Sequence, residues 1–150
     1  MRAAVQRWAI GRVLYGARAV LSRAQSADAV RTLVQRAAPF VARKEQYEAS
    51  APFAMGEARG RWIRPAGSPQ GGIILYFHGG GFVAECRAIH DALLAAIGRA
   101  AGARGLMIDY RLAPEHPYPA AADDCFAAWN WMLSSGFDPA LSAEPCGAKK

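Results

Sequence analysis

The chain has 150 residues, of which 53% are hydrophobic and 20% charged, a composition typical of a globular domain and not of a disordered segment. Its net charge of +6 arises at the N-terminus, because residues 1–45 hold nine basic and two acidic residues while the remainder holds nine and ten. We therefore expect no nucleic-acid partner, which would need a basic surface on the domain itself. The longest stretch without charged side chains, residues 65–84, contains two prolines and six glycines, which excludes a membrane span there.

The three cysteines, Cys86, Cys125 and Cys146, are odd in number and form no CxxC pair. This pattern fits neither a disulfide framework nor a zinc site. We therefore expect ordinary thiols, no metal, and a reducing, cytoplasmic environment.

The first 45 residues are predicted to form basic helices. Residues 3–24 have a helical composition, and a second helix begins at Ser26 or Asp28, either of which can cap it. Pro39 is expected to end this second helix. Because the N-terminus is rich in Arg and Ala and poor in acids, organelle targeting is an alternative role for it. Contact with a membrane surface is another.

Strands are expected in the middle of the chain. Residues 46–64 lack a helical period and are predicted to contain two edge strands, the second near residues 57–65. Residues 65–72 form a turn-rich connector. Residues 73–77 and 105–110 are short apolar runs, which are typical of parallel strands covered on both faces.

Two helices alternate with these strands. The first is predicted over residues 88–101 with Gly102 as its stop, and the second runs from Pro119 to Ser134. Three prolines exclude a helix over residues 111–119. The apolar faces expected on these helices are Leu93, Leu94 and Ile97, pointing inward, and Phe126, Trp129 and Leu133, with Trp129 in the core. The alternation predicts an α/β fold with a parallel sheet over residues 46–139, followed by an irregular tail over 140–150.

The segment IILYFHGGGF, residues 73–82, places three glycines directly after a buried strand. A phosphate cradle would need a Lys, Ser or Thr at a set spacing after the glycines, and none is present. A dinucleotide site would need an acid about 20 residues further on, whereas Asp109 follows Gly81 by 28 residues. A tight turn without a catalytic role remains open. Consecutive glycines also allow two backbone N–H groups to approach one oxyanion, which is the chemistry of acyl transfer.

The motif HGGGF at residues 78–82, His90, and DYRLAPEHPYPAAADD at residues 109–124 resemble the hormone-sensitive-lipase-like family of α/β-hydrolases. The resemblance covers about residues 57–139. It implies the N-terminal part of an α/β-hydrolase fold, a mostly parallel sheet flanked by helices, with residues 1–45 as cap-type helices. It also implies a carboxylic-ester hydrolase that acts on small-molecule esters without cofactor or metal.

The resemblance assigns roles to individual residues. Gly80 and Gly81 would supply the oxyanion N–H groups, and Gly79 would permit the turn. His78 would fix the loop without acting as the catalytic base, and Phe82 would line the substrate pocket. Support of the loops by polar contacts is implied for Asp109, Tyr110, Arg111, Glu115 and Asp124. Of the other histidines, we expect His90 to pack or cap a helix and His116 to lie at the surface.

The sequence contains no catalytic nucleophile of the expected kind. None of the seven serines lies in a G-x-S-x-G elbow, and no apolar strand follows residue 140. The chain is therefore expected to be truncated before the elbow, to lack the Ser, Asp and His of a triad, and to be inactive alone. Strands 73–77 and 105–109 would then each lack a neighbour on one side. The alternative function is non-catalytic ligand binding or interaction on the same scaffold.

Overall fold

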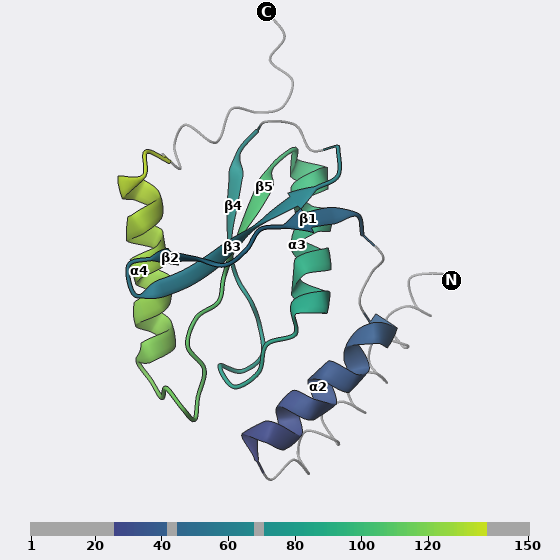
Figure 1. The fold of residues 1–150 in the computed structure, drawn as a ribbon, viewed down its shortest axis with the longest axis vertical. Coiled ribbons are helices and arrows are strands. Elements are labelled where there is room, and N and C mark those ends of the chain that lie inside the picture. Colours follow the sequence, from purple (N-terminus) through teal and green to yellow (C-terminus); the bar gives the residue numbers. More distant parts are fainter. Residues whose placement is uncertain (1–25, 42–44, 68–70, 138–150) are drawn as a thin grey trace, which may run out of the picture.

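The computed structural model describes residues 26–41, 45–67 and 71–137. Along the chain, its elements are α2 (Ala27–Val41), β1 (Tyr47–Ala49), β2 (Phe53–Met55), β3 (Ala58–Pro65), β4 (Ile73–Phe77), α3 (Arg87–Ala101), β5 (Arg104–Ile108) and α4 (Ala120–Ser134) (Figure 1). The helix predicted over 3–24 and the tail predicted over 140–150 lie outside the described residues. Within the described ranges, no helix is long and apolar enough to cross a membrane.

The five strands form one mixed sheet in the order β1-β3-β5-β4, with β2 also paired to β3. Only β4 and β5 run parallel among the described strands, and the pairs of β3 with β1, β2 and β5 are antiparallel. The expectation of a mostly parallel sheet is therefore wrong for this part of the fold. For β2 and β3 the physical reason is the short turn between Met55 and Ala58, which pair with each other, because so short a connection can join only antiparallel strands.

The segment before β4 holds three strands and not the two that were predicted. β3 is not an edge strand, because it pairs with β1 and β2 on one side and with β5 on the other. Its alternating burial places Ala58 and Trp62 toward one face of the sheet and Ile63 toward the other. Its charged residues made the strand resemble an edge, but Arg61 is buried, while Arg59 and Arg64 are exposed.

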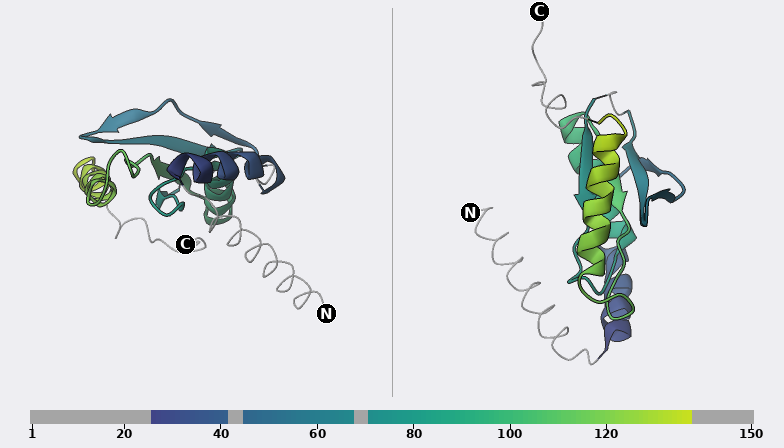
Figure 2. Two further views of the ribbon diagram at one scale, coloured as in Figure 1. Left: turned by 90° about the horizontal axis from the view of Figure 1, so that it is seen from below. Right: turned by 90° about the vertical axis from the view of Figure 1, so that its left-hand side faces the viewer.

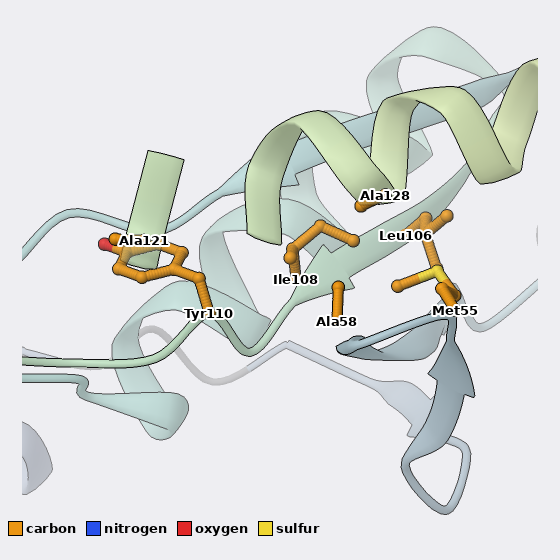
Figure 3. Close-up of a cluster of buried hydrophobic side chains, with 7 residues drawn as sticks. All are labelled: Met55, Ala58, Leu106, Ile108, Tyr110, Ala121 and Ala128. Carbon is orange, nitrogen blue, oxygen red and sulfur yellow. The ribbon is translucent and has the colours of Figure 1, made fainter. Parts of the chain in front are cut away.

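The helices α3 and α4 cover opposite faces of the sheet, as the two further views show (Figure 2). Alternate residues of β5 divide between them: Leu106 and Ile108 belong to the core beneath α4, and Met107 to the core beneath α3. Figure 3 shows the first core, in which Ala128 of α4 lies close to Leu106. Each face of β5 is therefore buried, as the continuous apolar run predicted.

The bounds of α3 and α4 agree with prediction, but their large apolar side chains do not point inward as expected. Leu94 is buried, whereas Leu93, Ile97, Phe126, Trp129 and Leu133 are all at least 38% exposed. Small residues face the sheet instead; the buried positions include Ala92, Ala95 and Gly98 on α3 and Ala121 and Ala128 on α4. Helices with small residues on the inner face pack closely on the sheet, so periodicity alone selected the wrong side of α4.

The ends of the predicted helices were read correctly in two cases and wrongly in one. Ser26 caps α2, because its Oγ accepts a hydrogen bond from the Ala29 N–H at 3.2 Å. Gly102 ends α3 in the left-handed conformation at φ 64°. Pro39, however, lies inside α2, which continues to Val41. Pro39 has no N–H to donate within the helix, but the backbone stays helical through Val41.

One edge of the sheet is formed by β4, whose residues are only partly buried. The predicted open edge is therefore present at β4, but β5 has a neighbour on each side, which corrects the expectation for residues 105–109. The connection from β4 through α3 to β5 crosses one face of the sheet, and α4 lies on the other face. Because such connections are right-handed, a parallel strand placed after α4 would pair with the free edge of β4.

Candidate active site

The glycine loop, defined as residues 78–84, begins where β4 ends. Figure 1 shows this loop, the loop after β5 and the helix α2 at the same end of the sheet. In α/β folds, ligands bind beyond the carboxyl ends of parallel strands, which is where β4 and β5 deliver these two loops. The loop after β5, residues 109–119, is free of helix, as its prolines predicted.

The backbone of the glycine loop takes up left-handed conformations at three consecutive residues. The φ angles are 138° at Gly80, 63° at Gly81 and 60° at Phe82. A Cβ at Gly80 would lie 1.8 Å from the carbonyl oxygen of Ala84, so only glycine fits there. Gly79, which was expected to permit the turn, has no positive φ, and a Cβ there would meet only His90 at 3.8 Å. The turn is therefore made by the residues after Gly79.

The N–H groups of Gly80 and Gly81 donate to no backbone or side-chain acceptor within the part of the chain that the structure describes. The turn is closed by other groups, because the Val83 and Ala84 N–H groups both donate to the Gly80 carbonyl, at 3.2 and 3.1 Å. Both glycines are exposed. Two adjacent amides are thus available to an external acceptor at the end of β4.

His78 is the buried residue at the start of the glycine loop. It is 4% exposed, and its Nδ1 lies 3.0 Å from the Gly79 carbonyl oxygen, which can accept a hydrogen bond from a ring N–H. The Tyr110 hydroxyl donates to the His78 carbonyl oxygen at 2.5 Å. The two rings are stacked, with centroids 4.2 Å apart and planes 11° from parallel. His78 is therefore placed to support the loop, and its ring does not face an exposed surface.

His90 of α3 lies behind the same loop. Its Nδ1 is 3.3 Å from the Tyr76 hydroxyl, and its ring centroid is 5.6 Å from that of His78. Burial lowers the pKa of His90, and the nearby His78 lowers it further, which favours the neutral ring. These contacts agree with the expected packing role, and His116 is exposed as expected.

A buried ion cluster lies behind the glycine loop on the α3 side of the sheet. Its centre is Arg61 of β3, which is 3% exposed and bonds to Asp109 after β5, to Asp91 of α3 at 2.6 Å and to Glu85 at 3.2 Å. Arg87 approaches Asp109 at 3.5 Å from the outside. The expected polar support by Asp109 is therefore supplied through Arg61, which sequence reasoning missed.

The charges of this cluster stabilise one another. Burial by itself would lower the pKa of Arg61. Its hydrogen bond to Asp91 and its attraction to Asp109 raise the pKa by more than burial lowers it, so Arg61 stays charged. Burial raises the pKa of Asp109, and the Arg61 guanidinium opposes that rise. A signal for Arg61 did exist, since it shares the two-residue period of Ile63 on the buried face of β3.

Arg111 and Asp124 join the loop after β5 to the start of α4. Asp124 is 1% exposed and accepts from the Arg111 backbone N–H at 2.8 Å, from its Nε at 3.0 Å and from its Nη2 at 2.7 Å. Charge-assisted, bidentate contacts of this kind are among the strongest hydrogen bonds in proteins. The structure thus brings together two residues for which loop support was expected.

Glu115 is held by a residue that sequence reasoning did not single out, Arg31 of α2. The guanidinium donates to both carboxylate oxygens of Glu115, at 2.7 and 2.6 Å. The hydrogen bond from Arg31 lowers the pKa of Glu115 to about 2. No sequence signal within α2 distinguishes Arg31 from Arg36, because both lie in a basic helix and their partners are far along the chain.

Phe82 is 61% exposed, with its ring 6.0 Å from that of Tyr110. A cavity of about 460 Å³ lies between α2 and the start of α3, and Phe82 is not among the residues that line it. Its lining residues are Gln35, Ala38, Pro39, Glu85, Cys86, Arg87 and Ala88. The role of Phe82 in a substrate pocket thus stays a prediction.

Comparison with known proteins agrees with this arrangement. A family model of the α/β hydrolase fold matches residues 74–147. The carboxylic ester hydrolase LipN of Mycobacterium tuberculosis is 43% identical over 89 residues, which are 59% of this chain and 24% of that protein. The acetyl-hydrolase of Streptomyces hygroscopicus is 38% identical over 97 residues, covering 63% of this chain and 32% of that protein. Human hormone-sensitive lipase is 42% identical over 73 residues, which cover 48% of this chain and 7% of the lipase.

Solved structures show the same likeness. An esterase of the bacterial hormone-sensitive lipase family superposes with a TM-score of 0.71 at 33% identity, covering 86% of this chain and 43% of the esterase. The chain thus has the α/β-hydrolase fold. Its sequence and structure resemble the N-terminal part of hormone-sensitive-lipase-like proteins. It spans about a quarter to a third of the length of the first two curated relatives.

Proposed function

We propose that this chain supplies the oxyanion-binding part of a carboxylesterase that acts on short or medium acyl esters. The observation that carries the proposal is that the N–H groups of the exposed residues Gly80 and Gly81 have no acceptor among the described residues. In ester hydrolysis, a tetrahedral intermediate places negative charge on the former carbonyl oxygen. Backbone N–H groups that are already oriented stabilise this charge without reorganisation.

The surroundings of the glycine loop support this role. His78 and Tyr110 fix the start of the loop, and the Arg61 cluster fixes the residues that follow it. A strand on the free edge of β4 would end beside Gly80 and Gly81. In α/β-hydrolases a serine on a sharp strand-to-helix turn attacks the substrate carbonyl. We therefore propose that the nucleophile is delivered at this edge.

Within these 150 residues no serine lies in a G-x-S-x-G elbow. A loop that binds an oxyanion cannot form the acyl-enzyme, so we propose that this polypeptide by itself has negligible turnover. The purified chain should hydrolyse p-nitrophenyl butyrate no faster than the heat-denatured chain, and a fluorophosphonate probe should label none of its serines. Turnover together with labelling of one serine would overturn this part of the proposal.

The oxyanion role itself is tested in a chimera. Residues 26–137 of this chain, which include Arg31, replace the matching N-terminal part of the bacterial esterase, which provides the remainder of the fold and its own nucleophile. We expect the chimera to hydrolyse p-nitrophenyl butyrate. A chimera that folds, as judged by circular dichroism, but that neither turns over the ester nor reacts with fluorophosphonate would favour the non-catalytic, ligand-binding alternative.

A further inference from the structure

The side chain of Arg31 reaches from α2 to both loops of the candidate site. Its Nε donates to the Val83 carbonyl oxygen at 2.8 Å, and its Nη2 donates to the Ala113 carbonyl oxygen at 3.0 Å. The same guanidinium forms the two-pronged contact with Glu115. One side chain therefore connects three segments that lie up to 84 residues apart in the sequence.

These contacts close a ring of hydrogen bonds around the end of the glycine loop. The Ala113 N–H donates to the Phe82 carbonyl oxygen at 2.8 Å, while Arg31 holds the next carbonyl, that of Val83. Phe82 is a non-glycine residue at a φ of 60°, and such a conformation persists only where its surroundings hold it. The carbonyls of Phe82 and Val83 are thus fixed from outside, directly after the amides of Gly80 and Gly81.

We propose that Arg31 is a positioning residue of the glycine loop, which orients the Gly80 and Gly81 amides by anchoring the Val83 carbonyl and the loop after β5. The proposal rests on the proposed oxyanion role in so far as these amides bind substrate. Under this proposal, the position of α2 affects the geometry of the glycine loop through Arg31.

An ordinary surface ion pair does not account for the arrangement. The Glu115 side chain is 54% exposed, and exposed pairs contribute little to stability. The contacts with Val83 and Ala113 are of another kind, since they are partly buried and end on backbone carbonyls. Only a planar guanidinium with several N–H groups can make all of them together, so lysine is not an equivalent replacement.

The packing of α2 supports the same conclusion. Among the side chains of α2 that the structure describes, Ala38, near the end of the helix, is the one that is buried. In the first half of the helix, Val30, Leu33 and Val34 are only half-buried. Arg31 lies in that half and supplies the direct connection to the loops.

The test is residue-resolved amide hydrogen exchange, measured by NMR on the full 150-residue chain. The reporters are the Val83, Ala84 and Ala113 amides, whose acceptors lie within the ring or the turn that it supports. We expect Arg31→Ala to speed their exchange about tenfold or more, with shifted Gly80 and Gly81 amide resonances, while the amides of β5 keep their protection. Arg31→Lys should restore less than half of the lost protection.

Two further variants separate this role from general stability. Glu115→Gln keeps the carbonyl contacts of Arg31, so the reporters should exchange less than about threefold faster. Arg36→Ala, an exposed position on the same helix, should leave them unchanged. If Arg31→Ala frays α2 but leaves the Val83, Ala84 and Ala113 amides as protected as before, the proposal is wrong. Because no ester is hydrolysed in this experiment, its failure is distinct from failure of the oxyanion role.

Discussion

The two loops at the carboxyl ends of β4 and β5 differ from the segments that support them in one respect, which is how far apart in the sequence the contacting residues lie. Within each loop the contacts are local, since His78 bonds to the next residue and Arg111 to Asp124, 13 residues on, while Tyr110 and His78 join the two loops across 32 residues. The supports from outside the loops span 30 and 48 residues for Arg61 with Asp91 and Asp109, and 84 residues for Arg31 with Glu115. Local contacts therefore set the geometry within each loop, and contacts from distant segments hold the loops in place.

The largest effect is expected at the distant support. Arg61→Met would leave the carboxylates of Glu85, Asp91 and Asp109 without their buried partner, which should lower the free energy of unfolding by about 3–5 kcal/mol. Urea denaturation followed by circular dichroism measures the loss. Arg59→Ala, at an exposed position of the same strand, is the control and should change stability by less than about 0.5 kcal/mol. Equal effects of the two variants would show that the cluster supports nothing.

Within the glycine loop, the effect should depend strongly on position. Gly80→Ala places a Cβ against the Ala84 carbonyl at a φ of 138°, so we expect a loss of about 1–3 kcal/mol. Gly79→Ala meets only an ordinary contact with His90 and should change stability by less than about 1 kcal/mol. Thermal denaturation of both variants makes the comparison. Similar melting temperatures for the two would contradict the loop geometry.

The local pair at the start of α4 provides an intermediate case. Asp124→Asn replaces a carboxylate oxygen that accepts from Arg111 with an amide that donates, which should cost about 1–3 kcal/mol in the urea experiment. Asp123→Asn, next to it and exposed, should be nearly neutral. A neutral Asp124→Asn would mean that the contact with Arg111 does not stabilise this loop.

The smallest effect is expected at the exposed contact between Arg31 and Glu115. The pKa of Glu115 falls from its ordinary value of 4.5 to about 2 in the folded chain. Its contribution to stability is therefore complete above pH 4.5 and is lost as the pH falls toward 2. The stability difference between the wild type and Glu115→Gln should follow this course and shrink in 1 M NaCl. A difference that is independent of both pH and salt would refute the assignment.

The limits of sequence reasoning follow the same division between local and distant contacts. The glycine loop, the end of α3 at Gly102 and the strand β5 could be predicted from the sequence, because local patterns determine them. The antiparallel setting of β3 and the clamp by Arg31 were not, because they depend on which segments meet in space. The outward face of α4 was misread, since Ala121 and Ala128 pack more closely on the sheet than Phe126 could.

The oxyanion role of the Gly80 and Gly81 amides is tested most directly by the rate constant of the chimeric esterase. Measured with p-nitrophenyl butyrate, Gly80→Ala should lower kcat by about 10²–10³ with KM little changed, whereas Gly79→Ala should lower it by less than about tenfold. Both variants must keep the circular dichroism spectrum of the parent chimera. Equal kcat values for the Gly80→Ala and parent chimeras would contradict the proposed role of these amides.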